Sequence, residues 1–131
     1  MVSGYTVVNL KEVEDQAPKF GYAPQLESRF ARRALGLENS GISHFKLAPG
    51  FRVPFGHHHA DQEEVYVVVA GSARIKLGDE IVDLGAWDAV RVPPEVTRGM
   101  EAGPDGAEVL AFCAPSNENA DAQMVRDFWP Q

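Results

Sequence analysis

Short apolar stretches separated by turn residues are the main pattern along this chain. Each stretch spans about five to eight residues and is rich in β-branched and aromatic side chains, and many of the 12 glycines and 9 prolines fall between the stretches. This rhythm is typical of an all-β sandwich or barrel. It predicts strands within residues 5–10, 28–35, 42–47, 64–70, 73–77, 80–84, 87–92, 96–100 and 107–112.

Turn signals predict how these strands connect. Ala70-Gly71-Ser72 and Gly78-Asp79-Glu80 each predict a tight hairpin, because glycine adopts a positive φ without steric cost. The sequence AGPDG at 102–106 separates the last two predicted strands. Near the C-terminus, residues 119–128 predict at most one short helical turn.

The bulk properties indicate one ordinary globular domain over residues 1–131. The chain is 44% apolar and 24% charged, as is usual for such domains. No apolar run approaches the roughly 18 residues of a membrane span, and no signal peptide is visible at the N-terminus. We therefore expect a cytoplasmic protein with no membrane partner. The net charge of −7 argues against a nucleic-acid partner, since phosphate binding requires a clustered cationic face.

The stretch PFGHHHADQEEVYVVVAG carries the candidate chemistry. Side chains two positions apart share one face of a strand, so His57 and His59 point together and His58 points away. If the intervening loop turns the chain back, Glu64 on the next strand meets both histidines. Two imidazoles and a carboxylate suit a divalent metal such as Fe, Mn, Ni or Zn. The competing interpretation is a surface loop that happens to be rich in histidine.

The same stretch resembles the first conserved motif of the cupin superfamily, G-x(5)-H-x-H-x(3,4)-E-x(6)-G. Six residues rather than five separate the first glycine from the first histidine, and the resemblance extends over about residues 41–113. The residues that match are Gly50, His57, His59, Glu64 and Gly71.

The second cupin motif, G-x(5)-P-x-G-x(2)-H-x(3)-N, resembles the segment that begins at Gly85. Pro93 takes the proline position. Two positions depart from the motif, because Glu95 stands in place of its glycine and Arg98 in place of its histidine. The final asparagine is also missing.

The resemblance implies a jelly-roll barrel, also called a double-stranded β-helix, with short N- and C-terminal extensions. It implies a metal held by two histidines, a glutamate and the second-motif histidine, of which His57, His59 and Glu64 carry over. Arg98 cannot be a ligand, because its guanidinium has no free lone pair and stays protonated.

Three arrangements of Arg98 stay open. It turns away from a metal held by three protein ligands, or it pairs with Glu64 in place of the metal, or it binds an anionic substrate beside the metal. His44 and Gln62 are candidates for a further metal contact. Strand alternation leaves open whether His44 or Phe45 faces the barrel interior.

Other side chains have expected places. Tyr66 shares a face with the predicted metal ligand two positions before it and offers a hydroxyl to the pocket. Met100 is expected to face inward, Trp87 to pack against the barrel, and Lys76 to be exposed.

The function implied by the resemblance is that of a small cupin that binds one divalent metal and acts on a small organic molecule, anionic if Arg98 binds it. Tyr66 and Arg98 are then the expected catalytic residues, and an enzyme of this type would be a metal-dependent dioxygenase or isomerase. The alternative is a metal-free module that binds or senses a small molecule, with an Arg98–Glu64 pair in place of the metal. Single-domain cupins are commonly homodimers, so we expect a homodimer.

Overall fold

The computed structural model describes residues 4–116 and 121–130, and most of its regular structure is β. The short helices are 3-10 segments Leu10–Glu12 and Ala17–Phe20 and the single turn α1, Arg32–Leu35. The strands are β1 (Leu26–Phe30), β2 (Gly41–Leu47), β3 (Phe55–His58), β4 (Glu63–Leu77), β5 (Glu80–Leu84), β6 (Ala89–Val92), β7 (Arg98–Ala114) and β8 (Gln123–Arg126).

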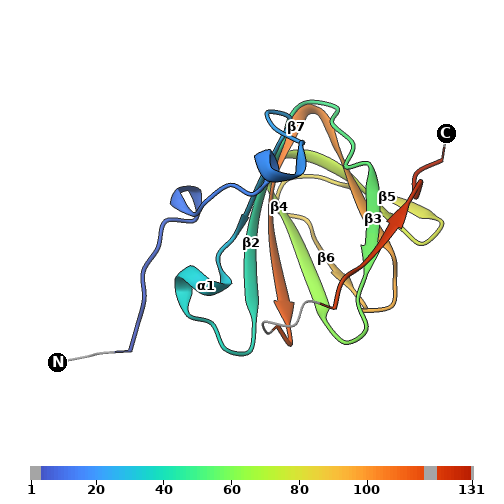
Figure 1. The fold of residues 1–131 in the computed structure, drawn as a ribbon. Helices are drawn as coiled ribbons and strands as arrows, with labels where there is room; N and C mark the ends of the chain where they lie inside the picture. The colour runs from blue at the N-terminus through green and yellow to red at the C-terminus, as the bar shows by residue number, and fades with distance from the viewer. Residues whose placement is uncertain (1–3, 117–120, 131) are drawn as a thin grey trace.

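Two long antiparallel strands, β4 and β7, hold the barrel together. The first half of β4 pairs with β6 and with the end of β7, and its second half pairs with β5 and with the start of β7. On the other side of β7 lie β2 and then β1, while β3 meets the first residue of β7 and carries β8. One continuous sheet therefore curls into a jelly-roll barrel (Figure 1). The predicted all-β barrel is confirmed.

The sheet bends at a corner where β4 and β7 face each other. The register of β4 shifts on both sides of this corner, and Gly71, with φ 72°, pairs with Ala107. A Cβ atom on Gly71 would lie 2.0 Å from the carbonyl oxygen of Gly106. The hairpin predicted at Ala70-Gly71-Ser72 and the break predicted at 102–106 are therefore wrong. A glycine with positive φ serves a β-bulge as well as a turn, and these two segments form a paired bend inside long strands.

The second predicted hairpin is confirmed, because Leu77 pairs with Glu80 across Gly78. The strand predicted within 28–35 stops at Phe30 and is followed by α1.

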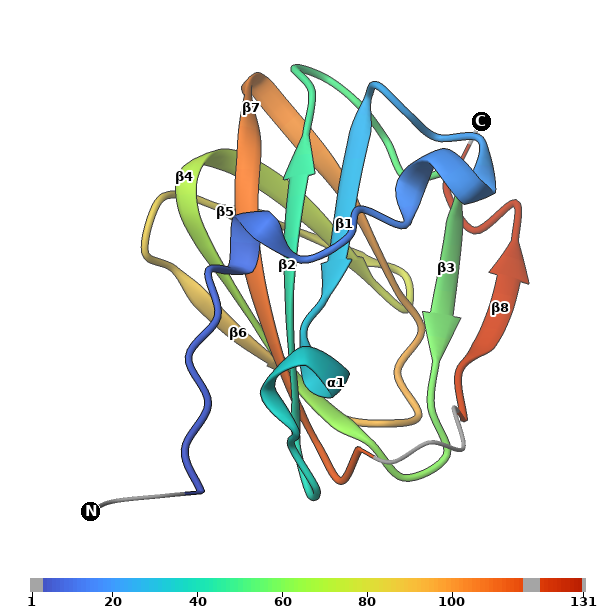
Figure 2. The ribbon, with the colours of Figure 1, turned by 60° about the vertical axis from the view of Figure 1, so that its left-hand side comes forward.

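The N-terminal segment does not form the strand predicted within residues 5–10. It is extended without strand pairing as far as the first 3-10 turn, and Tyr5 and Val7 are 71% and 84% exposed. Figures 1 and 2 both show this segment leaving the barrel. Local β propensity forms a strand only where a neighbouring strand supplies hydrogen bonds and apolar cover.

At the other end of the chain, β8 replaces the predicted helical turn, of which residues 119–120 lie outside the described part of the chain. β8 lies beside β3 (Figure 2). Phe128 follows it and packs where Gly56 and Gly99 leave space, and Trp129 is buried. The strand β8 therefore covers the edge of β3, the strand that carries His57.

Alternate residues of the strands fill the barrel interior. Val68, Ile75, Val92 and Val109 are fully buried. Two sequence-based expectations about other side chains are wrong. Trp87 is 75% exposed on the turn before β6, and Lys76 is buried, with its Nζ atom 3.6 Å from the centre of the Phe128 ring. No helix in residues 4–116 or 121–130 is long and apolar enough to cross a membrane.

The corner predicts different costs for two glycine substitutions. Gly71→Ala should lower the free energy of unfolding by at least about 3 kcal/mol, because a methyl group there collides with backbone rather than with a flexible side chain. Gly78→Ala is the matched control: its φ is also positive, at 58°, but nothing lies within 4 Å of the added Cβ. It should cost only the strain of the backbone, about 1–2 kcal/mol. Urea unfolding of both variants checks this, and equal losses would contradict the role assigned to the corner.

Candidate functional site

Strand β3, the loop that follows it and strand β4 bring three ligand-type side chains together inside the barrel. One ligand atom from each of His57, His59 and Glu64 lies within 4.8 Å of the other two. The rings of the two histidines are 5.0 Å apart, centre to centre. His58, between them, does not belong to this group. The alternation inferred from the sequence therefore matches the geometry of these residues.

One oxygen atom, Glu64 Oε1, is the centre of the site. It lies 3.3 Å from His57 Nε2, 3.2 Å from His59 Nε2 and 3.4 Å from Arg98 Nη1, and it accepts a 2.8 Å hydrogen bond from the Tyr66 hydroxyl. Glu64 is 8% exposed and Arg98 is 2% exposed. Four polar side chains thus surround one buried carboxylate oxygen.

Asp121 fixes the orientation of His59. Its Oδ1 atom lies 2.7 Å from His59 Nδ1, and its Oδ2 atom accepts hydrogen bonds from the backbone N–H groups of Ala60 and Asp61. An ionised carboxylate can only accept, so Nδ1 carries a proton. The opposite nitrogen, Nε2, then faces Glu64 across 3.2 Å. These two acceptors need a cation between them, which is either a second proton on the imidazole or a metal ion.

The distances also fit a shared metal. Two ligand atoms that each lie about 2.1 Å from one ion, at the angles of tetrahedral or octahedral coordination, are about 3.0–3.4 Å apart. Both Nε2–Oε1 distances lie in this range. A carboxylate behind the ligating imidazole is the usual support of a metal-bound histidine. The donor set of His57, His59 and Glu64 therefore fits a divalent metal.

Arg98 comes from the start of β7, opposite His57 in the sheet. It approaches Glu64 as a single ion pair at 3.4 Å without the geometry of a hydrogen bond, and its Nη2 atom donates to the Pro93 carbonyl at 2.7 Å. Arg98 therefore neither turns away from the site nor forms a bidentate pair with Glu64. Within the described residues, its Nε and Nη1 atoms have no hydrogen-bond acceptor.

The surroundings shift the pKa values of the two central oxygen groups in opposite directions. Burial opposes the charge of Glu64, but hydrogen bonds from His57 and Tyr66 and the positive charge of the imidazoles outweigh it and lower its pKa. Burial, followed by the nearby negative charge of Glu64, raises the pKa of Tyr66 well above its ordinary value. Glu64 is thus held as an acceptor and Tyr66 as a donor.

His44 and Gln62 do not join the site, so their proposed contact with a metal is wrong. His44 lies on the outer side of β2, with Nε2 2.7 Å from Glu108 Oε1, while Phe45 faces the interior. Gln62 donates instead to the Pro115 carbonyl. The sequence pattern could not show which side of β2 faces inward, because both sides carry apolar and polar residues.

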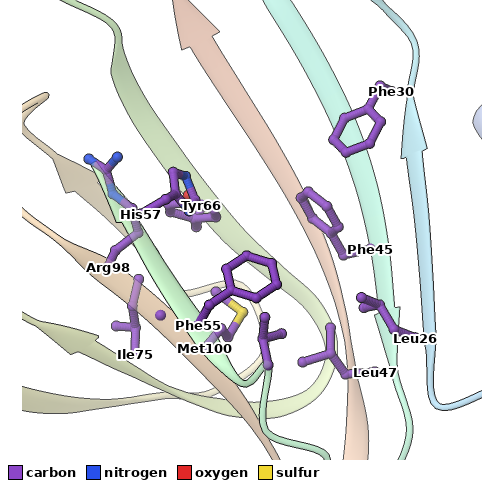
Figure 3. Close-up of a pocket in the computed structure, with 12 residues that line it drawn as sticks. Leu26, Phe30, Phe45, Leu47, Phe55, His57, Tyr66, Ile75, Arg98 and Met100 are labelled. Carbon is purple, nitrogen blue, oxygen red and sulfur yellow. The ribbon is translucent and has the colours of Figure 1, made fainter. Parts of the chain in front are cut away.

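A cavity of about 190 Å³ adjoins this cluster. His57, Tyr66 and Arg98 stand together at one end of it, and the side chains of Phe45 and Leu47 lie at the other (Figure 3). Phe55 and Met100 line the space between them, so the inward position predicted for Met100 is confirmed. The pocket is therefore apolar except where it meets the cluster.

No pattern in the sequence pointed to Asp121. It lies 57 positions after Glu64 in a polar C-terminal stretch, outside both motif-like segments. Only the return of the chain beside β3 brings it to His59.

Comparisons with known proteins agree with this fold. A protein-family model described as Cupin domain matches residues 43–113. No curated protein matches the sequence. A cupin protein from Bacteroides fragilis has a similar structure, with 22% identity, a TM-score of 0.71 and 91% of each chain covered.

Two enzymes also share the fold. Pac13 from Streptomyces, described as a nucleoside dehydratase and solved with uridine, is 20% identical with a TM-score of 0.70, and 96% of this chain and 92% of that chain are covered. Oxalate decarboxylase from Bacillus subtilis is 23% identical with a TM-score of 0.76. The similarity covers 94% of this chain but only 32% of the decarboxylase. At these identities the structures show a common fold.

The role of Asp121 gives a prediction that needs no metal. Asp121→Ala should lower the free energy of unfolding by about 1–3 kcal/mol, because it leaves His59 and two backbone N–H groups without their acceptor. Amide hydrogen exchange at Ala60 and Asp61 should accelerate, while exchange in β5 should not. Exposed Asp105→Asn is the control. Unchanged exchange at Ala60 and Asp61 would show that Asp121 does not hold this loop.

Proposed function

This chain belongs to the cupin family, and we propose that His57, His59 and Glu64 hold one divalent metal ion in the barrel, where the protein acts on a small organic molecule. The observation that supports this most directly is the approach of both Nε2 atoms to the same carboxylate oxygen. Three donors leave open positions for a substrate.

The chain's own residues have distinct parts in this proposal. When bound, the metal would supply Lewis acidity toward an oxygen of the substrate. Arg98 attracts and orients an anionic group, and Tyr66, kept protonated by its raised pKa, donates a hydrogen bond to Glu64 or to the substrate. The apolar wall of the pocket excludes water from the reacting group. Dioxygenases and isomerases are the enzyme classes that the family resemblance implies, and the donor set suits either.

The neighbouring structures support small-molecule chemistry in such a barrel. One is named for a reaction of a nucleoside and another for a reaction of oxalate. Those substrates are very different, so the fold itself selects neither for this chain.

A second candidate function is a metal-free module that binds or senses a small molecule. The 3.4 Å approach of Arg98 to Glu64 favours it, because the arginine already balances the buried negative charge. In this version the histidines and Arg98 form the binding surface.

A homodimer is part of the proposal as well. The N-terminal segment leaves the barrel without strand pairing (Figure 1), and its Tyr5 and Val7 side chains are exposed, so a second copy could cover them. The cytoplasmic location and the single domain over residues 1–131 stay predictions.

Elemental analysis of protein purified without an affinity tag tests the metal site. The unmodified protein should carry about one ion per chain, and His57→Ala and Glu64→Ala should carry almost none, because each removes one of three protein ligands. His58→Ala is the matched control: it removes a histidine from the same tripeptide but not from the cluster, so it should keep the metal.

Two results would contradict the metal proposal. One is unmodified protein that stays empty after incubation with Fe(II), Mn, Ni and Zn, which would favour the metal-free module. The other is equal metal loss in His58→Ala and His57→Ala, which would place any ion on the surface of the histidine loop.

A further inference from the structure

We propose that the ligand of this site is a small carboxylic acid with an apolar body, aromatic or branched, whose carboxylate lies against Arg98. This inference rests on the proposed function and names its substrate class. Three features of the pocket carry it: the free hydrogen-bonding groups of Arg98, the shape and composition of the cavity, and the balance of charge.

Arg98 has the capacity to bind an anion. It is 2% exposed, and its Nε and Nη1 atoms have no acceptor among the described residues. A buried donor without a partner is costly, so such groups generally have an occupant in the working protein. Arg98 lines the cavity, and its two unpartnered nitrogen atoms lie buried behind the cavity wall, so a carboxylate that reached them from the cavity would supply charge-assisted acceptors.

The rest of the pocket selects an apolar body. Beyond His57, Tyr66 and Arg98, the wall is made of side chains such as Phe45, Leu47 and Met100 (Figure 3). A polar chain would lose its hydration there without gaining hydrogen bonds. A sugar-like ligand is therefore disfavoured at this end, and a hydrocarbon group is favoured.

The volume limits the size. A cavity of about 190 Å³ is smaller than the roughly 300–1,000 Å³ of sites for drug-sized ligands. An apolar cavity of about 150 Å³ is enough for a benzene ring. One ring or a short branched chain, together with a carboxylate, therefore matches the space.

The balance of charge in the site makes the affinity for an acid depend on whether the metal is bound. Without a metal, the charges of Glu64 and Arg98 cancel. A bound divalent ion would leave an excess of two positive charges beside the cavity, reduced to one if Asp121 behind His59 is counted. A monoanion offsets this excess, so the acid should bind more tightly when the metal is present.

Isothermal titration calorimetry with three compounds tests the proposal, using protein of measured metal content with and without added Zn²⁺. Phenylacetate should bind at least tenfold more tightly than acetate, which lacks the apolar body, and than phenylacetamide, which lacks the charge. Its affinity should rise when Zn²⁺ is bound.

Two arginine variants test whether Arg98 is the residue that binds the carboxylate. Arg98→Gln should weaken the binding of phenylacetate at least tenfold and change the affinity for phenylacetamide less than threefold. Arg91→Gln should change neither affinity, because Arg91 lies on an exposed strand position and pairs with Glu63. The comparison of the three compounds on the unmodified protein tests charge and apolar body without any variant.

The outcomes separate this inference from the metal proposal. If phenylacetate binds metal-loaded protein no better than acetate or phenylacetamide does, the proposal of a carboxylic-acid ligand is wrong, while the proposed metal site is unaffected. A second result would be protein that takes up no Zn²⁺ and still prefers phenylacetate, with Arg98→Gln abolishing that preference. This result would support the carboxylic-acid ligand and contradict the metal site. Selectivity that survives Arg98→Gln would overturn the role of Arg98.

Discussion

A negatively charged carboxylate buried in an apolar barrel needs compensation, and this constraint organises the molecule. The free energy of removing Glu64 from water is offset only if positive charge and hydrogen-bond donors surround it. The chain supplies them from separate elements: His57 from β3, His59 from the loop after it, Tyr66 from β4 and Arg98 from β7. Their convergence on one oxygen atom requires the strands to curl as they do.

The corner in β4 and β7 is what makes this curl possible. At Gly71 the backbone of β4 comes so close to Gly106 that no side chain fits, and both strands change direction there. The first half of β4 then carries Glu64 and Tyr66 into the barrel, while the second half carries Ile75 to the same pocket. A glycine far from the chemistry thus sets the position of the groups that perform it.

Local sequence pattern was enough to predict much of the fold and the three clustered side chains of the site. The alternation of side chains along a strand predicted that His57 and His59 point together, and that Glu64 meets them if the loop between them turns the chain back. Turn residues separated most of the strands. The hairpin at Gly71 was misjudged because a positive φ suits both a turn and a bulge, and only the partner strand decides between them. Asp121 was missed for a related reason: its contact with His59 depends on the C-terminal segment lying beside β3. The sequence of one segment alone does not determine which distant segment it pairs with.

The replacement of the second-motif histidine by Arg98 gives the site two ways to balance Glu64, by a metal or by the arginine. The geometry is compatible with both. The distances from the histidine nitrogen atoms to Glu64 Oε1 suit a shared ion, and Arg98 Nη1 lies 3.4 Å from the same oxygen while its Nε and Nη1 atoms have no hydrogen-bond acceptor among the described residues. We take the metal as the partner of Glu64, which leaves Arg98 for an anionic ligand. X-ray diffraction from crystals soaked in Zn²⁺, with data collected at the zinc absorption edge, tests this most directly. We expect one anomalous peak about 2.0–2.2 Å from His57 Nε2, His59 Nε2 and a Glu64 oxygen. A barrel without a peak, with Arg98 moved into a bidentate pair with Glu64, would contradict it.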